Sequence, residues 1–290
     1  GSEMCIRDSI WAIAGGLAGR LVPPHAVGTA TAIIFGGVAV ASVLGVPLGA
    51  FVGGLAGWRA AFGAMAACCA AVLLLIALAL PPLPPPRSLS VRQLTAQLAN
   101  PAVRVGLLVT LFLVAGHFMA YTFVRPLLQS HAGFGQSWIG PLLFAYGAAG
   151  VAGNFVAGTA AARQPGRTLL TIALALLLTL ALLAGFGHLR IASGLLLVAW
   201  GLAYGGVSVS LQAWMIRAAP DAFEAATALF VAMFNLGIAA GSLLGVPSVD
   251  ALGLRANLWL AAACMLLPAG ALWWWRRQPA RARETGTAFR

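Results

Sequence analysis

Apolar stretches long enough to cross a membrane recur along almost the whole chain, separated by short polar breaks. A helix needs about 20 apolar residues to span the hydrocarbon core of a bilayer. Overall, 61% of the residues are hydrophobic and only 8% are charged, with a mean hydropathy of +0.95. A soluble domain of this length does not bury so much apolar surface. The sequence therefore predicts an all-α, multi-span membrane protein.

The apolar pattern predicts one partial and eight complete membrane-spanning helices. The predicted spans are 10–22 (partial), 29–54, 58–80, 104–126, 137–160, 168–187, 191–215, 224–247 and 255–275.

An internal repeat links two parts of the chain at an offset of 196 positions. Without gaps, residues 24–80 and 220–276 are identical at 14 of 57 positions. Such repeats indicate duplicated architecture, and duplicated membrane halves are typical of secondary transporters. The shared positions include Gly45 with Gly241, Gly49 with Gly245, Gly57 with Gly253, and Arg59 with Arg255.

The repeat also predicts how the chain is divided. Residues 1–9 share nothing with their repeat counterpart, so we interpret them as a foreign leader. Residues 10–80 are then the remainder of an N-terminal bundle, and 81–103 a cytoplasmic linker. Residues 104–275 form a C-terminal bundle of six helices, followed by a basic cytoplasmic tail, 276–290. By the same register, the first three helices of a twelve-helix protein are expected to be missing.

The net charge of +11 comes from 17 arginines and no lysine. The arginines lie mostly in the breaks between spans, a pattern that sets membrane topology and does not indicate nucleic-acid binding. Apart from Arg7 in the leader, twelve lie on the side of the linker and C-terminus, and four on the other side, namely Arg59, Arg125, Arg190 and Arg255. The positive-inside rule therefore predicts a cytoplasmic C-terminus and the lipid bilayer as the chain's main partner.

Glycines four residues apart occur in both repeats. Gly45, Gly49 and Gly53 lie on one face of their helix, and Gly241 and Gly245 lie on one face of the equivalent helix. Small residues at this spacing let a neighbouring helix approach closely, and Pro47 bends the first helix. The pattern indicates either a gating contact of a transporter or a tight helix pair without a gating role.

The residues around this motif resemble a known family. The run Gly-Val-Pro-Leu-Gly at 45–49, Gly-Trp-Arg at 57–59 and GHFMAYTFVRPLL at 116–128 are similar to motifs of the major facilitator superfamily. The closest resemblance is to the twelve-helix drug/proton antiporter branch that includes sugar and purine-nucleoside efflux proteins. It implies two six-helix halves related by a parallel repeat, the bacterial inner membrane, and alternating-access export of a small organic solute. It also implies that the glycine-proline motif restricts leak in exporters.

Polar side chains within the spans are candidates for lining a substrate cavity, because burying them in lipid is costly. Two stripes with a spacing of four residues are predicted, together with two single asparagines. The candidates are His117, Tyr121 and Arg125; Tyr204, Ser208 and Gln212; and Asn154 and Asn235. The alternative roles are hydrogen bonding between helices and, for Arg125, extension of its guanidinium to the outer interface.

Proton coupling requires a titratable group within the membrane. None of the six acidic residues lies in a predicted span, and His117 is the only candidate with a suitable ordinary pKa. The proton carrier is thus either His117 or a carboxylate in the helices expected to precede this chain.

Charged residues in two loops on the cytoplasmic side carry a second resemblance to the family. The segment 158–167 is similar to its loop signature of glycine, an acidic residue and arginine, but Ala162 replaces the acid. Asp221 and Glu224 are expected to begin the next helix. The loop candidates are Arg163, Arg167, Arg217, Asp221 and Glu224.

Other classes of function have less support in the sequence. No catalytic set of residues, metal-ligand spacing or cofactor motif is apparent, so an intramembrane enzyme is disfavoured. A non-transporting sensor or scaffold and an importer of the same superfamily are the remaining alternatives. The expected partners are a small-molecule substrate and protons, with the protein a monomer.

Overall fold

The computed structural model describes residues 55–79 and 91–278, together with positions 23, 37, 41, 45, 48, 49, 52 and 53. These residues belong to two compact units. Helix α3 (Trp58–Ala79) lies in one, and the elements from α4 (Val91–Gln97) onward lie in the other. The predicted leader, the partial helix 10–22, Pro47 and the end of the basic tail fall outside the described residues.

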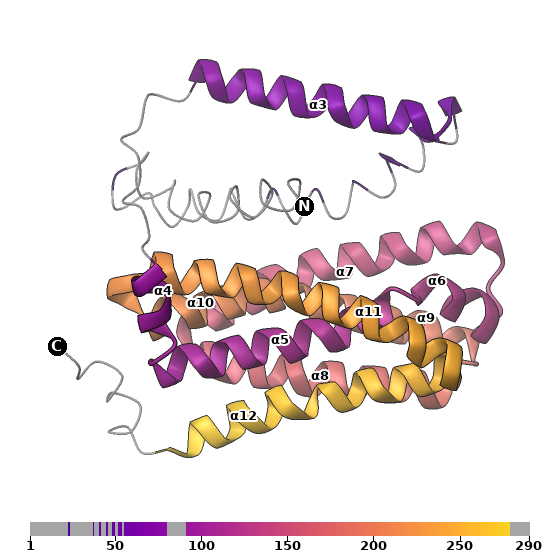
Figure 1. The fold of residues 1–290 in the computed structure, drawn as a ribbon. Helices are drawn as coiled ribbons and strands as arrows, with labels where there is room; N and C mark the ends of the chain where they lie inside the picture. Colours follow the sequence, from indigo (N-terminus) through magenta and orange to yellow (C-terminus); the bar gives the residue numbers. More distant parts are fainter. Residues whose placement is uncertain are drawn as a thin grey trace. The chain divides into compact units, whose positions relative to one another are not determined.

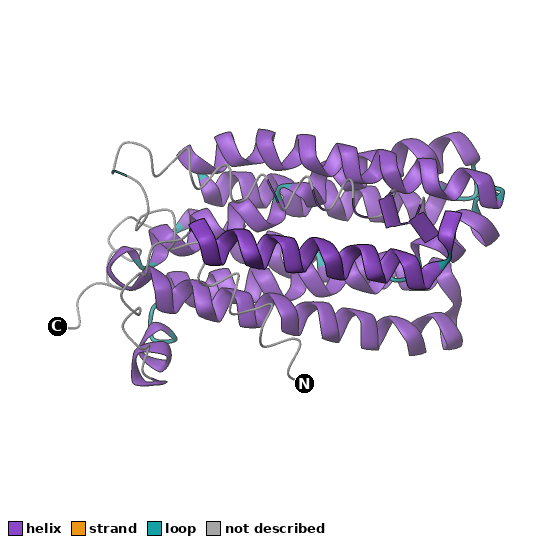
Figure 2. Ribbon diagram, turned by 90° about the horizontal axis from the view of Figure 1, so that it is seen from above, coloured by secondary structure: helices purple, strands orange, loops and turns teal. Residues whose placement is uncertain are grey.

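The described residues of the second unit form helices joined by short loops and turns, which Figure 2 shows in purple and teal. Its elements after α4 are α5 (Pro101–Tyr121), α6 (Val124–Pro126), the π-helical turn η2 (Leu127–His131), α7 (Gln136–Arg163), α8 (Pro165–Phe186), α9 (Arg190–Gly205), α10 (Val207–Ala218), the 3₁₀ turn η3 (Pro220–Ala222), α11 (Phe223–Cys264) and α12 (Leu266–Arg277).

Capping groups and backbone geometry explain where these helices begin and turn. The Asn100 side chain accepts hydrogen bonds from the amides of Ala102 and Val103, at 2.9 and 3.4 Å, and Pro101 occupies the first helical position of α5. At Gly253 the backbone of α11 has a φ of 83°, which divides this long helix into two arms. The predicted span 224–247 lies in the first arm, and the predicted span 255–275 covers the second arm together with most of α12.

The helices of the second unit pack side by side around a continuous apolar core (Figure 1). Helix α5 packs against α10, α11 and α12, α7 pairs with α9, and α8 packs against α9, α11 and α12. Leu113, Leu176, Trp200, Leu211 and Met265 are fully buried where these helices meet.

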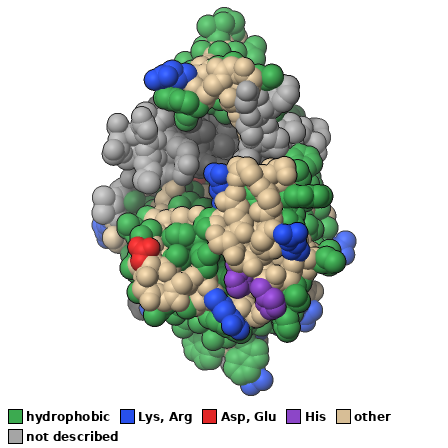
Figure 3. Space-filling view, turned by 90° about the vertical axis from the view of Figure 1, so that its right-hand side faces the viewer, with side chains coloured by type: hydrophobic (Ala, Val, Ile, Leu, Met, Phe, Trp, Pro, Cys, Tyr) green, Lys and Arg blue, Asp and Glu red, His purple; other side chains and the backbone are tan. Residues whose placement is uncertain are grey.

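Six helical stretches of the described residues are long and apolar enough to cross a membrane, including α3 and, as one continuous stretch, 220–277. Large apolar side chains also lie on the outside, among them Leu178 and Trp274, which are 60% and 57% exposed. In the end-on view of Figure 3, apolar side chains lie mainly around the periphery of the described residues. Exposed aliphatic and aromatic side chains on apolar helices are what lipid requires, so the chain is a multi-pass membrane protein.

Three predicted helices differ from the observed ones, and one of them is the span 255–275, which is divided at Met265 between α11 and α12. The predicted span 104–126 begins earlier, at Pro101, and its helix ends at Tyr121, before a short break and α6. The predicted span 191–215 is divided at Gly206 into α9 and α10. Apolar periodicity alone does not locate such breaks, because the residues on both sides remain equally apolar.

Candidate functional site

Five aromatic rings from three helices form a cluster within the second unit, and the Phe118 ring of α5 lies edge-on to three of them. His117 and Tyr121 lie on α5, Tyr146 on α7, and Trp200 and Tyr204 on α9. The rings of His117 and Tyr204 are stacked with centroids 3.3 Å apart, and those of Tyr121 and Tyr146 are stacked at 5.1 Å. Trp200 meets His117, Tyr121 and Tyr146 edge-on, at 5.4 to 5.9 Å. These residues, called the aromatic cluster below, form a continuous network of ring contacts.

A hydrogen bond determines the protonation pattern of His117. The indole Nε1–H of Trp200 donates to Nδ1 of His117 at 3.0 Å. An indole nitrogen only donates, so Nδ1 must be unprotonated, and the neutral ring then carries its proton on Nε2. Since His117 is only 1% exposed, Trp200 and the stacked Tyr204 hold its ring in one orientation.

The Tyr204 hydroxyl is different, because it is buried without a hydrogen-bond partner among the described residues. A buried phenol normally has a partner, and an unpaired one calls for an explanation. A solute lying against the aromatic cluster would supply the missing hydrogen-bonding group. The cluster therefore combines flat stacking surfaces with one uncommitted polar group.

Close glycine contacts bring α7 and α9 together beneath the cluster. A Cβ at Gly153 would collide with the carbonyl of Leu202, and one at Gly205 with the carbonyl of Gly150. One at Gly201 would collide with the carbonyl of Tyr146, itself a cluster residue. Only glycine permits backbones to approach this closely. The small residues thus determine how near Tyr146 lies to Trp200 and Tyr204.

The predicted polar stripes are only partly brought together. His117, Tyr121 and Tyr204 belong to the cluster, whereas Arg125 lies beyond the end of α5, exposed, and donates to the Gln136 side chain at 3.1 Å. Ser208 and Gln212, both half-buried, lie on α10 beyond the Gly206 break.

The two single asparagines lie on other helices. Asn154 is half-buried on α7, and Asn235 on α11 donates to the carbonyl of Val231 in its own helix, at 2.9 Å. Their proposed role in lining a cavity stays a prediction.

The glycines of the second half lie where α11 approaches α5 closely, and their gating role stays a prediction. A Cβ at Gly241 would collide with the carbonyl oxygen of Ala115 on α5, and one at Gly245 would lie 2.9 Å from the Phe123 ring. A Cβ at Gly237, one turn earlier, would lie 3.0 Å from the Cβ of Val114 on α5. For Gly45, Gly49 and Gly53, no described atom lies within 4 Å of such a Cβ, so their packing role stays a prediction.

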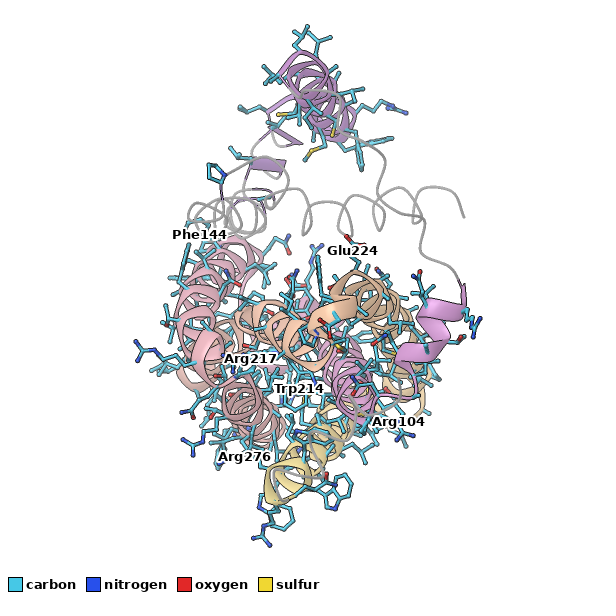
Figure 4. The ribbon with its side chains drawn as sticks, turned by 90° about the vertical axis from the view of Figure 1, so that its left-hand side faces the viewer. Arg104, Phe144, Trp214, Arg217, Glu224 and Arg276 are labelled. Carbon is cyan, nitrogen blue, oxygen red and sulfur yellow. The ribbon has the colours of Figure 1, made fainter. Side chains whose placement is uncertain are left out.

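Arg217 binds the end of a helix at the face shown in Figure 4. It donates to the carbonyl oxygens of Arg163, at 2.9 Å, and Ala162, at the C-terminus of α7. A helix C-terminus carries partial negative charge. The end of α7 therefore offers Arg217 the kind of acceptor that an acidic residue at position 162 would provide. Among the described residues Arg217 forms no ion pair with Asp221 or Glu224, which are exposed at the start of η3 and α11.

The same end of the second unit carries further charged residues. Arg167 is exposed near the start of α8, and Arg104, Arg217 and Arg276 appear together in Figure 4. The predicted division of the arginines between two faces stays a prediction. Assigning that face to the cytoplasm remains a prediction.

His131 and His188 approach each other in the loops at the other end, with ring centroids 6.4 Å apart (Figure 3). Burial lowers the pKa of His131, and the positive charges of His188 and Arg255 lower it further. Arg255 also donates to the carbonyl of Ala184 at 3.0 Å. The histidine pair therefore favours the neutral form of His131.

Sequence reasoning missed three residues of this region: Tyr146, Trp200 and Asn257. Trp200 precedes Tyr204 by four positions, the spacing of one helix face, but a tryptophan within an apolar span gives no signal of its own. Asn257 is a polar residue within the predicted span 255–275, so a search of the spans for polar side chains would have found it. No group of three or more potential metal-binding side chains occurs among the described residues.

These features define an all-helical membrane protein with a polar aromatic cluster enclosed by glycine-packed helices. The sequence model of the Major Facilitator Superfamily matches residues 7–225, and the chain belongs to this superfamily. The superfamily consists of membrane transporters rather than enzymes, which confirms the class and fold that the sequence motifs predicted.

Several curated relatives share much of the sequence. Purine ribonucleoside efflux pumps (NepI) from three strains of Escherichia coli are each 32% identical to it over 259 residues. The strains are O6:K15:H31 (536 / UPEC), O6:H1 (CFT073 / ATCC 700928 / UPEC) and O127:H6 (E2348/69 / EPEC). The matched region is 89% of this chain, and the chain spans 65% of the length of these relatives.

Proposed function

We propose that this protein exports a small planar solute of the purine-nucleoside type across the bacterial inner membrane by alternating access, with a cytoplasmic C-terminus. The observation that supports this most is the aromatic cluster with its unpaired Tyr204 hydroxyl. A nucleobase stacks on aromatic side chains, and each such contact contributes about 1–3 kcal/mol. The names of the relatives point to the same class of substrate.

Proton antiport is part of the proposal, and the structure limits how His117 would serve it. Protonation at Nδ1 would break the hydrogen bond from Trp200, because both atoms would then be donors. His117 acts as a proton carrier only if its ring separates from Trp200. Proton binding and a rearrangement of the aromatic cluster would therefore occur together.

Transport by inside-out membrane vesicles tests the proposal. With a proton gradient imposed, vesicles containing the protein are expected to accumulate a radiolabelled purine nucleoside, and an uncoupler should abolish the accumulation. Tyr121→Ala should raise KM roughly 5- to 150-fold through lost stacking, whereas Tyr121→Phe should retain near-normal transport.

The matched control is Phe155→Ala, which removes a ring from the outer face of α7, where Phe155 is 57% exposed. It should leave KM unchanged. Absence of nucleoside accumulation by folded protein, or accumulation only in right-side-out vesicles, would refute export of this substrate class.

A further inference from the structure

The break at the end of α5 leaves the backbone carbonyl of Met119 without its helical partner. In a regular helix the amide of Phe123 would donate to Met119, four residues earlier. Instead, it donates to Ala120 at 3.1 Å, and the preceding amide, of Thr122, donates to Phe118 at 3.2 Å. The Met119 carbonyl must therefore find another donor, because an unpaired carbonyl inside a membrane protein is costly.

Asn257 supplies that donor from the far arm of α11. Its Nδ2 donates to the Met119 carbonyl at 2.9 Å, and its side chain is only 1% exposed. Its Oδ1 accepts a hydrogen bond from the Ser248 hydroxyl, which also lies 2.8 Å from the Gly245 carbonyl. Both polar ends of the buried amide are thus engaged.

The two residues lie on opposite sides of the bend at Gly253. Ser248 precedes the bend and Asn257 follows it, so their contact joins the two arms of α11 to the break in α5. At the 196-residue offset the equivalent positions are occupied by Val52 and Ala61. These apolar side chains cannot form the same hydrogen bonds, so the arrangement is specific to the second half.

The break lies directly beside the aromatic cluster. Tyr121 is the last residue of α5, and His117 is one turn earlier. The direction of this last turn determines where both rings point. A side chain that anchors Met119, between them in sequence, also anchors the rings.

We propose that Asn257 is a positioning residue: by binding the free carbonyl of Met119, it holds the α5 break and so orients Tyr121 and His117 in the aromatic cluster. Asn257 itself does not contact the solute. Its effect on transport rests on the proposed function, but its effect on the break does not.

Hydrogen exchange at individual backbone amides tests this directly. In Asn257→Leu, which keeps the bulk but has no donor, the amides of Thr122–Arg125 should exchange about 5- to 100-fold faster than in the wild type. The amides of Leu107–Leu113, in the body of α5, should be unchanged. Asn257→Gln, which retains the amide, should restore part of the protection.

A pair of serines on α11 provides a matched control. Ser248→Ala removes the group that orients the Asn257 amide and should raise exchange at Phe123, even if Asn257→Leu does not fold. Ser242→Ala removes a hydroxyl at the same interface, 3.3 Å from the exposed Thr122 hydroxyl, and should leave exchange at Phe123 unchanged.

The outcomes separate this inference from the proposed function. Unchanged exchange at the break in both Asn257→Leu and Ser248→Ala, or a uniform rise along all helices, would overturn it. In transporting vesicles, Asn257→Leu should raise KM and retain most of the maximal rate, because the rings are displaced but not removed. If the wild type transports no nucleoside, the exchange measurements still decide the positioning role.

Discussion

Replacing Gly241 by alanine tests whether the contact between α5 and α11 determines the stability of the second unit. An added Cβ would overlap the Ala115 carbonyl oxygen and lie 2.9 Å from the Ala115 carbonyl carbon, whereas ordinary contact begins near 3.4 Å. These atoms belong to the backbone, so no change of rotamer relieves the overlap, and the two helices must move apart. Overpacking of this kind lowers the free energy of unfolding by about 1–3 kcal/mol. The higher helix propensity of alanine offsets up to about 1 kcal/mol of this loss.

Gly270 is the matched control on α12. It is exposed, and no described atom lies within 4 Å of a Cβ placed there. Gly270→Ala should therefore gain roughly 0.5–1 kcal/mol from helix propensity alone. Gly245→Ala should fall between the two variants, because its closest contact, 2.9 Å away, is the movable side chain of Phe123.

Thermal unfolding of the purified protein in detergent, followed by tryptophan fluorescence, measures the series. One kcal/mol corresponds to about 2–4 °C in Tm for a chain of this size class, so Gly241→Ala should unfold several degrees below Gly270→Ala. Equal Tm values for these two variants would show that the close approach of α5 and α11 contributes nothing to stability.

Three further changes test other parts of the structure. The pKa of His131 is lower in the folded protein than in the unfolded chain, where it is near 6.5. The free energy of unfolding is therefore unaffected by His131 above about pH 6.5, and it decreases as the pH falls from there toward the folded pKa. His131→Gln should flatten this decline in Tm between about pH 7 and pH 5, and an unchanged slope would exclude His131 as its cause. Arg217→Gln should destabilise the protein by about 1 kcal/mol in chemical denaturation, since it loses a charged donor to the C-terminus of α7; a wild-type midpoint would contradict this. Gly253→Ala should cost about 1–3 kcal/mol, because side chains rarely adopt its φ of 83°, and a wild-type Tm would show that the bend relaxes freely.

The repeat aligns two glycines that share the same backbone geometry in the structure. Gly57 and Gly253, aligned by the 196-residue offset, have φ values of 82° and 83°. Helix α3 then begins at Trp58, as the predicted span 58–80 required. A positive φ is a local property of glycine, so it is retained wherever the same turn recurs.

The aromatic cluster was only partly predictable. Spacing identified His117, Tyr121 and Tyr204 as residues of helix faces, because position along a helix determines direction. It did not identify Tyr146 or Trp200, which join the cluster only because Gly150, Gly153, Gly201 and Gly205 let α7 and α9 approach. Which helices become neighbours depends on the packing of the whole unit.

The sequence alone determined the membrane class, the repeat and the approximate extent of most described spans, because apolar length and local glycine and proline geometry are properties of neighbouring residues. Its motifs indicated the superfamily by resemblance. The tertiary structure decided which polar side chains meet. It ended α5 before Arg125, directed Arg217 to the end of α7, and joined Asn257 to Met119, 138 positions away. Each of these contacts joins residues that are distant in the chain, and the requirement to pair buried polar groups selects among them only once the helices are packed.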